Sequence, residues 1–137
     1  MKDYSQFHDG YLEGLWIDGT TVHVYLSTSE KERFTAVAEG VVALAASGFR
    51  AGNLIFEVVT RHNEEIALPD IAEVYYLRED PAGEREGTRL LGEARQEGLT
   101  LLEINPSYGA TCMVLARSVD LLERNEWLAR YAMIVGK

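Results

Sequence analysis

The dipeptide Asp18-Gly19, set between two runs of strand-forming residues, is the feature that most limits what this chain can fold into. The flanking runs, 11–17 and 20–28, are rich in β-branched, aromatic and other apolar residues. Asp-Gly is a preferred pair for the two-residue type I′ turn of a β-hairpin. The pattern therefore predicts an antiparallel hairpin, in which alternate side chains point to opposite faces.

The predicted register places Ile17 opposite Thr20 and gives the hairpin one strongly apolar face. That face would carry Tyr11, Leu15, Ile17, Val22, Val24 and Leu26. The other face would carry Leu12, Trp16, His23 and Tyr25. Because this second face is less polar than a solvated surface, we expect another element to cover part of it.

Further strands are predicted along the chain. Residues 53–60 form an apolar run that follows a Gly- and Asn-containing turn signal. Residues 99–105 and 110–117 frame the segment 106–109, Pro-Ser-Tyr-Gly, and so predict a second hairpin with a longer turn. Residues 119–123 are expected to continue the meander.

Helices are predicted over 70–77, where an Asp-x-x-Glu pattern can cap the first turn, and over the polar stretch 84–97. The stretch 29–48 fits two structures. Its apolar residues recur at helical spacing after a Ser-x-x-Glu capping box, which slightly favours a helix. Its content of Thr, Val and Phe, and the central Gly40, favour a strand.

These elements predict a single domain over 1–137 with an α+β fold. We expect a mostly antiparallel, twisted β-sheet in a meander-like order, with about five to seven strands and one to three short helices. An apolar content of 47% and a charged content of 26% are typical of a globular chain that buries a core.

The segment 127–135 is apolar apart from Arg130 and fits strand or helix equally well. A segment this apolar is expected to dock on its own domain or on a neighbouring molecule. The second possibility makes a homo-oligomer formed through 127–135 one of the functional alternatives.

The charge balance excludes some partners. Thirteen basic and twenty-two acidic residues give a net charge of −9, and no basic stripe is present, which argues against nucleic-acid binding. Residues 51–100 alone hold eleven acids and five bases, a charge that would suit a basic protein partner.

No apolar run is long enough to span a membrane, and the polar start of the chain lacks a secretory signal. With Cys112 as the lone cysteine, we expect a cytoplasmic protein.

The sequence carries no recognisable catalytic, cofactor-binding or metal-binding set. Cys112 lies in an apolar run, which raises the pKa of a thiol and makes it a poor nucleophile. His23 is expected on the outer surface and His62 in a loop, each without a partner ligand. The glycines of 48–53 lead into a strand, whereas a phosphate-binding loop leads into a helix.

Three residues are the candidates for binding: His8, Asp9 and Tyr108. His8 and Asp9 precede the first strand, and Tyr108 places an aromatic hydroxyl in the turn 105–109. The structural alternative is that His8 or Asp9 caps the entry to the first strand and that Tyr108 belongs to an ordinary turn. Binding would require the three groups to converge.

Two segments, Phe-His-Asp-Gly-Tyr-Leu at 7–12 and Pro-Ser-Tyr-Gly-Ala at 106–110, resemble a loose group of small uncharacterised bacterial proteins. Some members of that group are associated with immunity proteins of polymorphic toxin systems. The resemblance implies that the His-Asp pair leads into the first strand and that 40–44 is extended. It supplies no catalytic residues for this chain.

The leading hypothesis is a non-enzymatic cytoplasmic binding protein, such as an immunity-like inhibitor of a basic protein partner. The first alternative is a small-molecule binder or enzyme with a pocket at the sheet end near His8, Asp9 and Tyr108. The second is a structural or oligomeric module that associates through 127–135.

Overall fold

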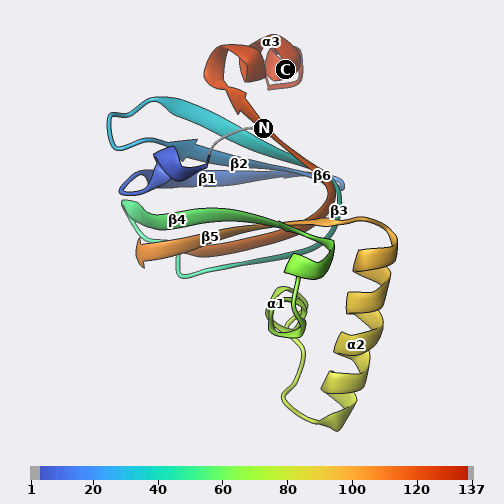
Figure 1. Ribbon diagram of the computed structural model, residues 1–137. Coiled ribbons are helices and arrows are strands. Elements are labelled where there is room, and N and C mark those ends of the chain that lie inside the picture. Colours follow the sequence, from blue (N-terminus) through green and yellow to red (C-terminus); the bar gives the residue numbers. More distant parts are fainter. Residues whose placement is uncertain (1–3, 136–137) are drawn as a thin grey trace.

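The computed structural model describes the backbone of residues 4–135 and the side chains of residues 4–131. Six antiparallel strands close into a barrel in the order β1-β2-β3-β6-β5-β4, with the helices outside it (Figure 1). The strands are β1 (Tyr11–Asp18), β2 (Thr21–Ser27), β3 (Arg33–Ser47), β4 (Asn53–His62), β5 (Thr100–Tyr108) and β6 (Thr111–Glu123). The helices are the 3₁₀ turns η1 (Ser5–Phe7) and η2 (Asn63–Glu65) and the α-helices α1 (Leu68–Val74), α2 (Pro81–Gln96) and α3 (Arg124–Val135).

The predicted α+β fold with an antiparallel sheet and short helices is confirmed, and the strand order shows how the sheet closes. β1-β2-β3 and β4-β5-β6 are two meanders. They join along the long pair β3–β6, and β6 curves in Figure 1 from its place beside β5 up to α3. The second joint, β1–β4, has only the pairs Tyr11↔Leu54 and Leu12↔Asn53. The barrel closes through β3–β6 and β1–β4, which pair strands that are far apart in the sequence. Local sequence patterns do not predict this closure.

The segment before β1 seals the short joint between β1 and β4. The Asp9 N–H donates to the Ile55 carbonyl at 3.0 Å, and the Ile55 N–H donates to the Gly10 carbonyl at 2.9 Å. Phe7 enters the barrel interior, where it is fully buried and meets Phe34 edge to face with ring centroids 5.4 Å apart. Phe7, from the segment before β1, therefore belongs to the core.

The first hairpin forms as predicted, but its register and its core face differ from the prediction. Asp18 pairs with Thr21 and Ile17 with Val22, so Gly19 and Thr20 make the turn. Gly19 has a φ of +61°, and positive φ at the first turn residue alone is typical of type II′ rather than type I′.

A β-bulge between Leu12 and Gly14 changes which residues of β1 face inward. Leu12, predicted on the outer face, is therefore buried in the barrel core. Two residues expected in the core lie outside it: Ile17 is 58% exposed at the end of β1, and the ring of Tyr11 lies beneath the Lys31 ammonium, 3.6 Å from the ring centroid.

The slight preference for a helix over 29–48 is wrong, because this stretch holds strand β3. Both faces of β3 are covered, so its apolar residues do not alternate strictly with polar ones. Leu44 packs against the barrel core, whereas Val37 on the other face contacts the layer formed by α3. Gly40, with a φ of +65°, lies opposite Arg117 and, with a register shift between Val41 and Ala43, lets β3 bend.

The second hairpin also forms, with a tighter turn than predicted. β5 continues through Tyr108, and Gly109, with a φ of +89°, makes the reversal. Residues 119–123 extend β6 without interruption. The buried amide of Asn53 joins this turn to its neighbours: its Oδ1 accepts from the N–H groups of Ala110 (3.1 Å) and Arg50 (2.7 Å).

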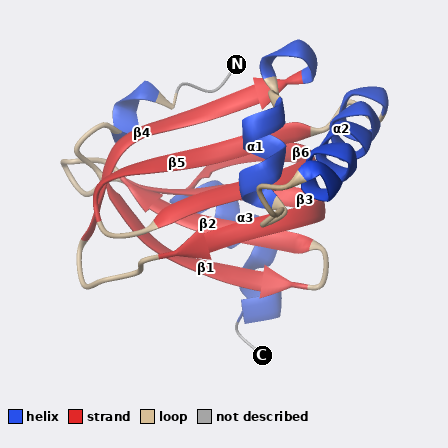
Figure 2. Ribbon diagram, turned by 90° about the horizontal axis from the view of Figure 1, so that it is seen from below, coloured by secondary structure: helices blue, strands red, loops and turns tan. Residues whose placement is uncertain are grey.

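Helices cover the barrel on two sides. α1 and α2, both predicted, lie over the strands β3, β6 and β5, as Figure 2 shows from below. Their shared core contains Ala45, Ile66, Ile71, Val74, Ala94, Leu99, Leu101, Met113 and Leu115. The apolar tail forms helix α3 and docks on its own barrel, where Trp127 packs against Val37 and Leu122. Among the described residues no helix is long and apolar enough to cross a membrane.

Candidate functional site

His8 and Asp9 lie together and hold the entry of β1 against β4. His8 Nδ1–H donates to the carbonyl of Phe56 at 2.6 Å, and the two rings meet edge to face. The Nε2 atom of His8 lies 3.7 Å from Asp9 Oδ2, with both side chains largely exposed. Asp9 has a φ of +63°, so it makes the sharp turn that brings η1 back onto β4. These contacts give the pair a structural role.

Tyr108 lies at the same end of the barrel, on β5. It is 51% exposed and sits across β4 from Tyr11, because both residues pair with Leu54. The shallow hollow beside His8 is lined by Tyr4, Ser5, His8, Phe56, Glu57 and Val58 and includes neither Asp9 nor Tyr108. The structure therefore brings His8 and Asp9 together without joining Tyr108 to them, and binding by this set stays a prediction.

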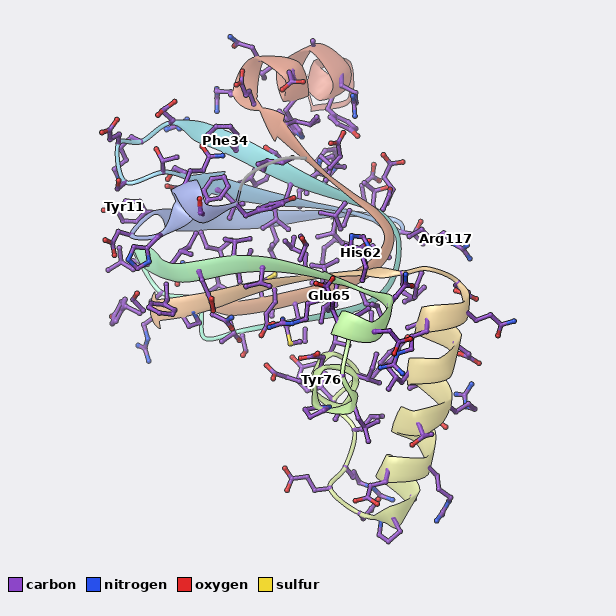
Figure 3. All side chains as sticks on the ribbon, in the orientation of Figure 1. Tyr11, Phe34, His62, Glu65, Tyr76 and Arg117 are labelled. Carbon is purple, nitrogen blue, oxygen red and sulfur yellow. The ribbon has the colours of Figure 1, made fainter. Side chains whose placement is uncertain are left out.

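A cleft of about 440 Å³, with several polar residues in its lining, lies where β4 and β5 meet the upper part of β6. Its lining includes His62 and Glu65, labelled in Figure 3, with Tyr4, Thr60, Thr100, Val119 and Asp120. His62 Nδ1 and Thr100 Oγ1 are 3.0 Å apart, and Glu65 Oε1 accepts from the His62 N–H at 3.0 Å. Burial, followed by the Asp120 charge, raises the pKa of Tyr4 to about 12, so its phenol is neutral at pH 7. The groups in this cleft can hydrogen-bond a ligand, but the described residues that line it include no thiol, lysine or serine nucleophile.

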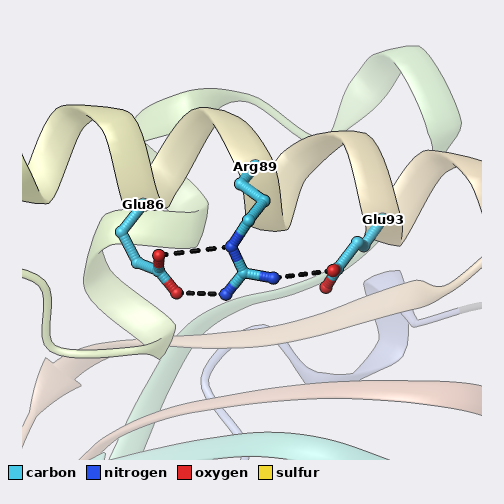
Figure 4. Close-up of polar contacts among 3 residues, drawn as sticks. All are labelled: Glu86, Arg89 and Glu93. Atoms are coloured by element: carbon cyan, nitrogen blue, oxygen red, sulfur yellow. Dashed lines mark hydrogen bonds and ion pairs between the residues drawn. The ribbon is translucent and has the colours of Figure 1, made fainter.

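The helical layer formed by η2, α1 and α2 carries most of the excess negative charge. Residues 63–98 contain ten acidic and four basic side chains, so −6 of the total charge of −9 lies here. Arg89 bridges Glu86 and Glu93 on α2 (Figure 4), with 2.7 Å between its Nη1 and Glu93 Oε1. The Arg89 hydrogen bond also lowers the pKa of Glu86. These two acids thus share one guanidinium within the layer.

Four other acids of the layer, Glu73, Glu79, Glu84 and Glu97, have no ion pair or side-chain hydrogen bond to the part of the chain that the structure describes. By contrast, Asp80 caps α2 by accepting from the Gly83 N–H at 2.7 Å and lies 3.2 Å from Arg78 Nε. The unpaired carboxylates are the ones that remain available to a partner.

An apolar groove of about 290 Å³ runs between α1 and α2, with two of these carboxylates on its rim. Its residues are Leu68, Pro69, Ala72, Leu77, Arg78, Glu79, Gly83, Glu84 and Gly87. The helices approach closely here because Gly87 lacks a side chain: a Cβ atom at Gly87 would lie 3.1 Å from Leu68 Cδ1 and 3.3 Å from Leu77 Cδ1. We call this feature the α1–α2 groove.

Tyr76 lies at the end of α1 (Figure 3), directly before the groove residue Leu77 in the sequence, and is 68% exposed. It has a φ of +54°, at a helix end where glycine is usual because other residues pay a steric penalty. The Leu77 N–H closes the end of α1 by donating to the Ala72 carbonyl at 2.9 Å. Tyr76 and the groove residue Leu68, which is 36% exposed, are the large exposed apolar side chains of this layer. Large exposed apolar side chains of this kind are common in interfaces.

His23 and Cys112 are buried and are not sites. The expectation that His23 lies on the surface is wrong: it is 1% exposed, stacks on Trp16 and accepts from Trp127 Nε1 at its Nδ1. Cys112 is fully buried in the barrel, where burial raises its pKa to about 12. No group of three or more His, Cys, Asp or Glu among the residues with described placement could hold a metal ion.

The sequence indicated the acidic middle of the chain but not the groove within it. The available signal was the pair Gly83 and Gly87, one helical turn apart on α2, which can form a close helix contact. The glycine pair indicates a groove only if a second helix packs against it, and the packing of α1 on α2 is a feature of the tertiary structure. Searches against protein-family models, curated proteins and solved structures found no match for this chain.

Proposed function

We propose that this protein is a non-enzymatic binding protein whose α1–α2 groove receives a basic segment of another protein. The observation that carries the proposal is the juxtaposition of an apolar groove with the unpaired carboxylates of Glu79 and Glu84 on its rim. An apolar side chain of the partner would enter between Leu68 and Leu77, and its Lys or Arg residues would face the two carboxylates.

Charge and exposure favour a basic protein over other occupants. A net charge of −6 on the helical layer accelerates encounter with a positive partner and repels nucleic acid and other polyanions. Exposed Tyr76 provides a large side chain that loses little conformational entropy on binding, as residues at interface centres do. The resemblance to a group associated with immunity proteins of polymorphic toxin systems makes a toxin domain the partner to test, and the setting would then be the cytoplasm.

Binding to toxin domains encoded beside the gene tests the proposal. Calorimetric titration at 50 and 500 mM salt should give a dissociation constant that rises about tenfold or more, because several ion pairs with exposed carboxylates are screened. The double variant Glu79→Gln, Glu84→Gln should weaken binding about 2- to 10-fold, as two exposed ion pairs would. Ala72→Arg, which fills the groove with a long cation, should weaken it further.

The matched control is Glu30→Gln, Glu32→Gln, which makes the same charge change in the loop between β2 and β3. It should bind the toxin domain as the parent does. Equal weakening by both double variants would assign the effect to net charge and overturn the groove as the binding surface. A dissociation constant that changes neither with salt nor with Ala72→Arg would also overturn the groove as the binding surface.

A further inference from the structure

A second cleft, on the opposite side of the barrel from the α1–α2 groove, gathers two arginines and an aromatic wall. It has a volume of about 300 Å³, at the small end of ligand pockets. Its lining is Glu13, Tyr25, Leu26, Arg33, Phe34, Thr35, Arg124 and Trp127. We call it the arginine cleft. Nothing in the proposed protein-binding function uses it.

The fold brings Arg33 and Arg124 to one place from distant parts of the sequence. Arg33 is the first residue of β3 and Arg124 the first of α3. The neighbouring pair Phe34↔Glu123 holds the start of β3 beside the end of β6, so the two arginines flank the same rung of the barrel. Three residues along α3, Trp127 lies on the same side of the helix as Arg124, as an i, i+3 pair does.

Neither guanidinium is neutralised within the described part of the chain. The side chains of Arg33 and Arg124 form no ion pair or hydrogen bond there, although acidic residues outnumber basic ones twenty-two to thirteen. By contrast, Arg61, Arg78, Arg89, Arg95 and Arg130 each lie within ion-pair distance of a carboxylate. The acid in the cleft, Glu13, already accepts from Ser27 Oγ at 2.7 Å. The cleft therefore carries two positive charges and one negative charge.

The apolar side of the cleft is rigid. Trp127 is 8% exposed, and its ring meets Tyr25 edge to face with centroids 5.5 Å apart. Its Nε1–H donates to His23 Nδ1 at 3.0 Å, so the indole cannot turn without breaking a buried hydrogen bond. A ligand pressed against this wall would meet a fixed aromatic edge while its anionic group meets the two guanidinium groups, which favour carboxylates and phosphates.

We propose that the arginine cleft is a binding site for a small organic anion, a carboxylate or phosphate ester with a planar or apolar body. Arg33 and Arg124 bind the anionic group, and Tyr25 and Trp127 contact the body. The negative charge of Glu13 opposes the binding of a simple monoanion, so removing that charge should strengthen binding.

Titration of the full chain with benzoate, phenyl phosphate and inorganic phosphate tests this, using calorimetry and the fluorescence of Trp127. Trp16→Phe leaves Trp127 as the only tryptophan and so assigns the signal. Arg33→Gln and Arg124→Gln should each weaken binding of phenyl phosphate about 5- to 30-fold, as loss of a charge-assisted hydrogen bond would. Arg50→Gln, an exposed arginine in the loop 48–52, is the matched control and should change nothing.

Glu13→Gln should tighten the binding of benzoate several-fold, because it removes a negative charge from the cleft while keeping an acceptor for Ser27. A variant that merely disturbed the fold would weaken binding, so this change of sign separates an electrostatic role from a structural one. Inorganic phosphate should bind at least tenfold more weakly than phenyl phosphate. Equal binding of the two, an effect of Arg50→Gln equal to that of Arg33→Gln, or no saturable binding of any probe would overturn the proposal.

Discussion

Trp127 Nε1 donates a hydrogen bond of 3.0 Å to Nδ1 of His23, and both side chains are buried between β2 and α3. The bond fixes the tautomer of His23, because Nδ1 must be unprotonated to accept. Trp16 stacks on the other side of the same imidazole with ring centroids 4.4 Å apart, and Tyr131 meets it edge to face. A single histidine therefore connects the outer face of the first hairpin to the last helix.

Replacing Trp127 with Phe should destabilise the protein by about 1–3 kcal/mol, because the Nδ1 atom of His23 would stay buried without its donor. Chemical denaturation followed by circular dichroism measures this change in the free energy of unfolding. Trp16→Phe is the control, since it also shortens an aromatic ring beside His23 but breaks no described hydrogen bond. A loss for Trp127→Phe no larger than that for Trp16→Phe would show that ring size, and not the hydrogen bond, matters.

The stability of the protein should fall as the pH drops below about 6.5, the ordinary pKa of histidine. Burial lowers the pKa of His23, and the opposing charges of Asp18 and Glu39 do not reverse this. Since the unfolded chain then binds the proton more readily than the folded one, the free energy of unfolding decreases from the unfolded pKa downward until the folded pKa is passed. His23→Gln keeps a side chain that can accept from Trp127 but cannot titrate. Denaturation between pH 5 and 8 should give a smaller slope for this variant, and equal slopes would assign the effect to other groups.

Local sequence patterns predicted the elements whose turn or capping signals lie next to them in the chain. Both hairpins, β4, α1 and α2 were predicted because their turn and capping signals lie within a few residues of the elements they define. The prediction was wrong where distant segments decide the outcome. β3 is covered on both faces by different layers, so the spacing of its apolar residues resembles that of a helix. The bulge at Leu12–Gly14 turns Leu12, in place of the predicted Tyr11, toward the barrel interior.

The candidate sites depended even more on tertiary structure. The structure places His8 and Asp9 against β4, and the shallow hollow that His8 lines includes neither Asp9 nor Tyr108. The α1–α2 groove and the arginine cleft are each made by residues from separate elements. Residue spacing within one element cannot predict that such residues lie together. The acidic excess of the middle of the chain was visible, but which carboxylates stay unpaired depends on the arginines that reach them.

Alanine at Gly40 should destabilise the protein by about 1–3 kcal/mol, because a residue with a side chain is strained at a φ of +65°. The new Cβ would also lie 2.7 Å from Arg117 Cδ and 3.0 Å from its Cβ. In an Arg117→Ala background the collision with Cδ disappears while the backbone strain remains, so part of the loss should be recovered. The control is Gly14→Ala, where no atom lies within 4 Å and φ is not positive. Equal effects of Gly14→Ala and Gly40→Ala in thermal denaturation would contradict the role of the bend.

Phe7→Ala should cost about 3–5 kcal/mol of stability, the usual loss for a fully buried phenylalanine. Phe7 fills the barrel interior from outside the strands, beside Phe34 and the β1–β4 joint. Phe56→Ala, at a residue 53% exposed, makes the same truncation on the surface and should change stability by less than about 0.5 kcal/mol. Comparable losses for the two variants, measured by urea denaturation, would show that the segment before β1 does not belong to the core.

Cys112 should react with iodoacetamide only when the barrel opens. It has no exposed surface, and burial raises its pKa from 9.0 to about 12, which lowers the thiolate fraction at pH 8 about a thousandfold. The labelling rate under native conditions should then follow the equilibrium population of the unfolded chain. Phe7→Ala should increase this rate at least about 100-fold, in line with its loss of stability, whereas Phe56→Ala should leave it nearly unchanged. Rapid labelling of the parent protein, detected by mass spectrometry, would mean that β6 opens locally without unfolding of the barrel.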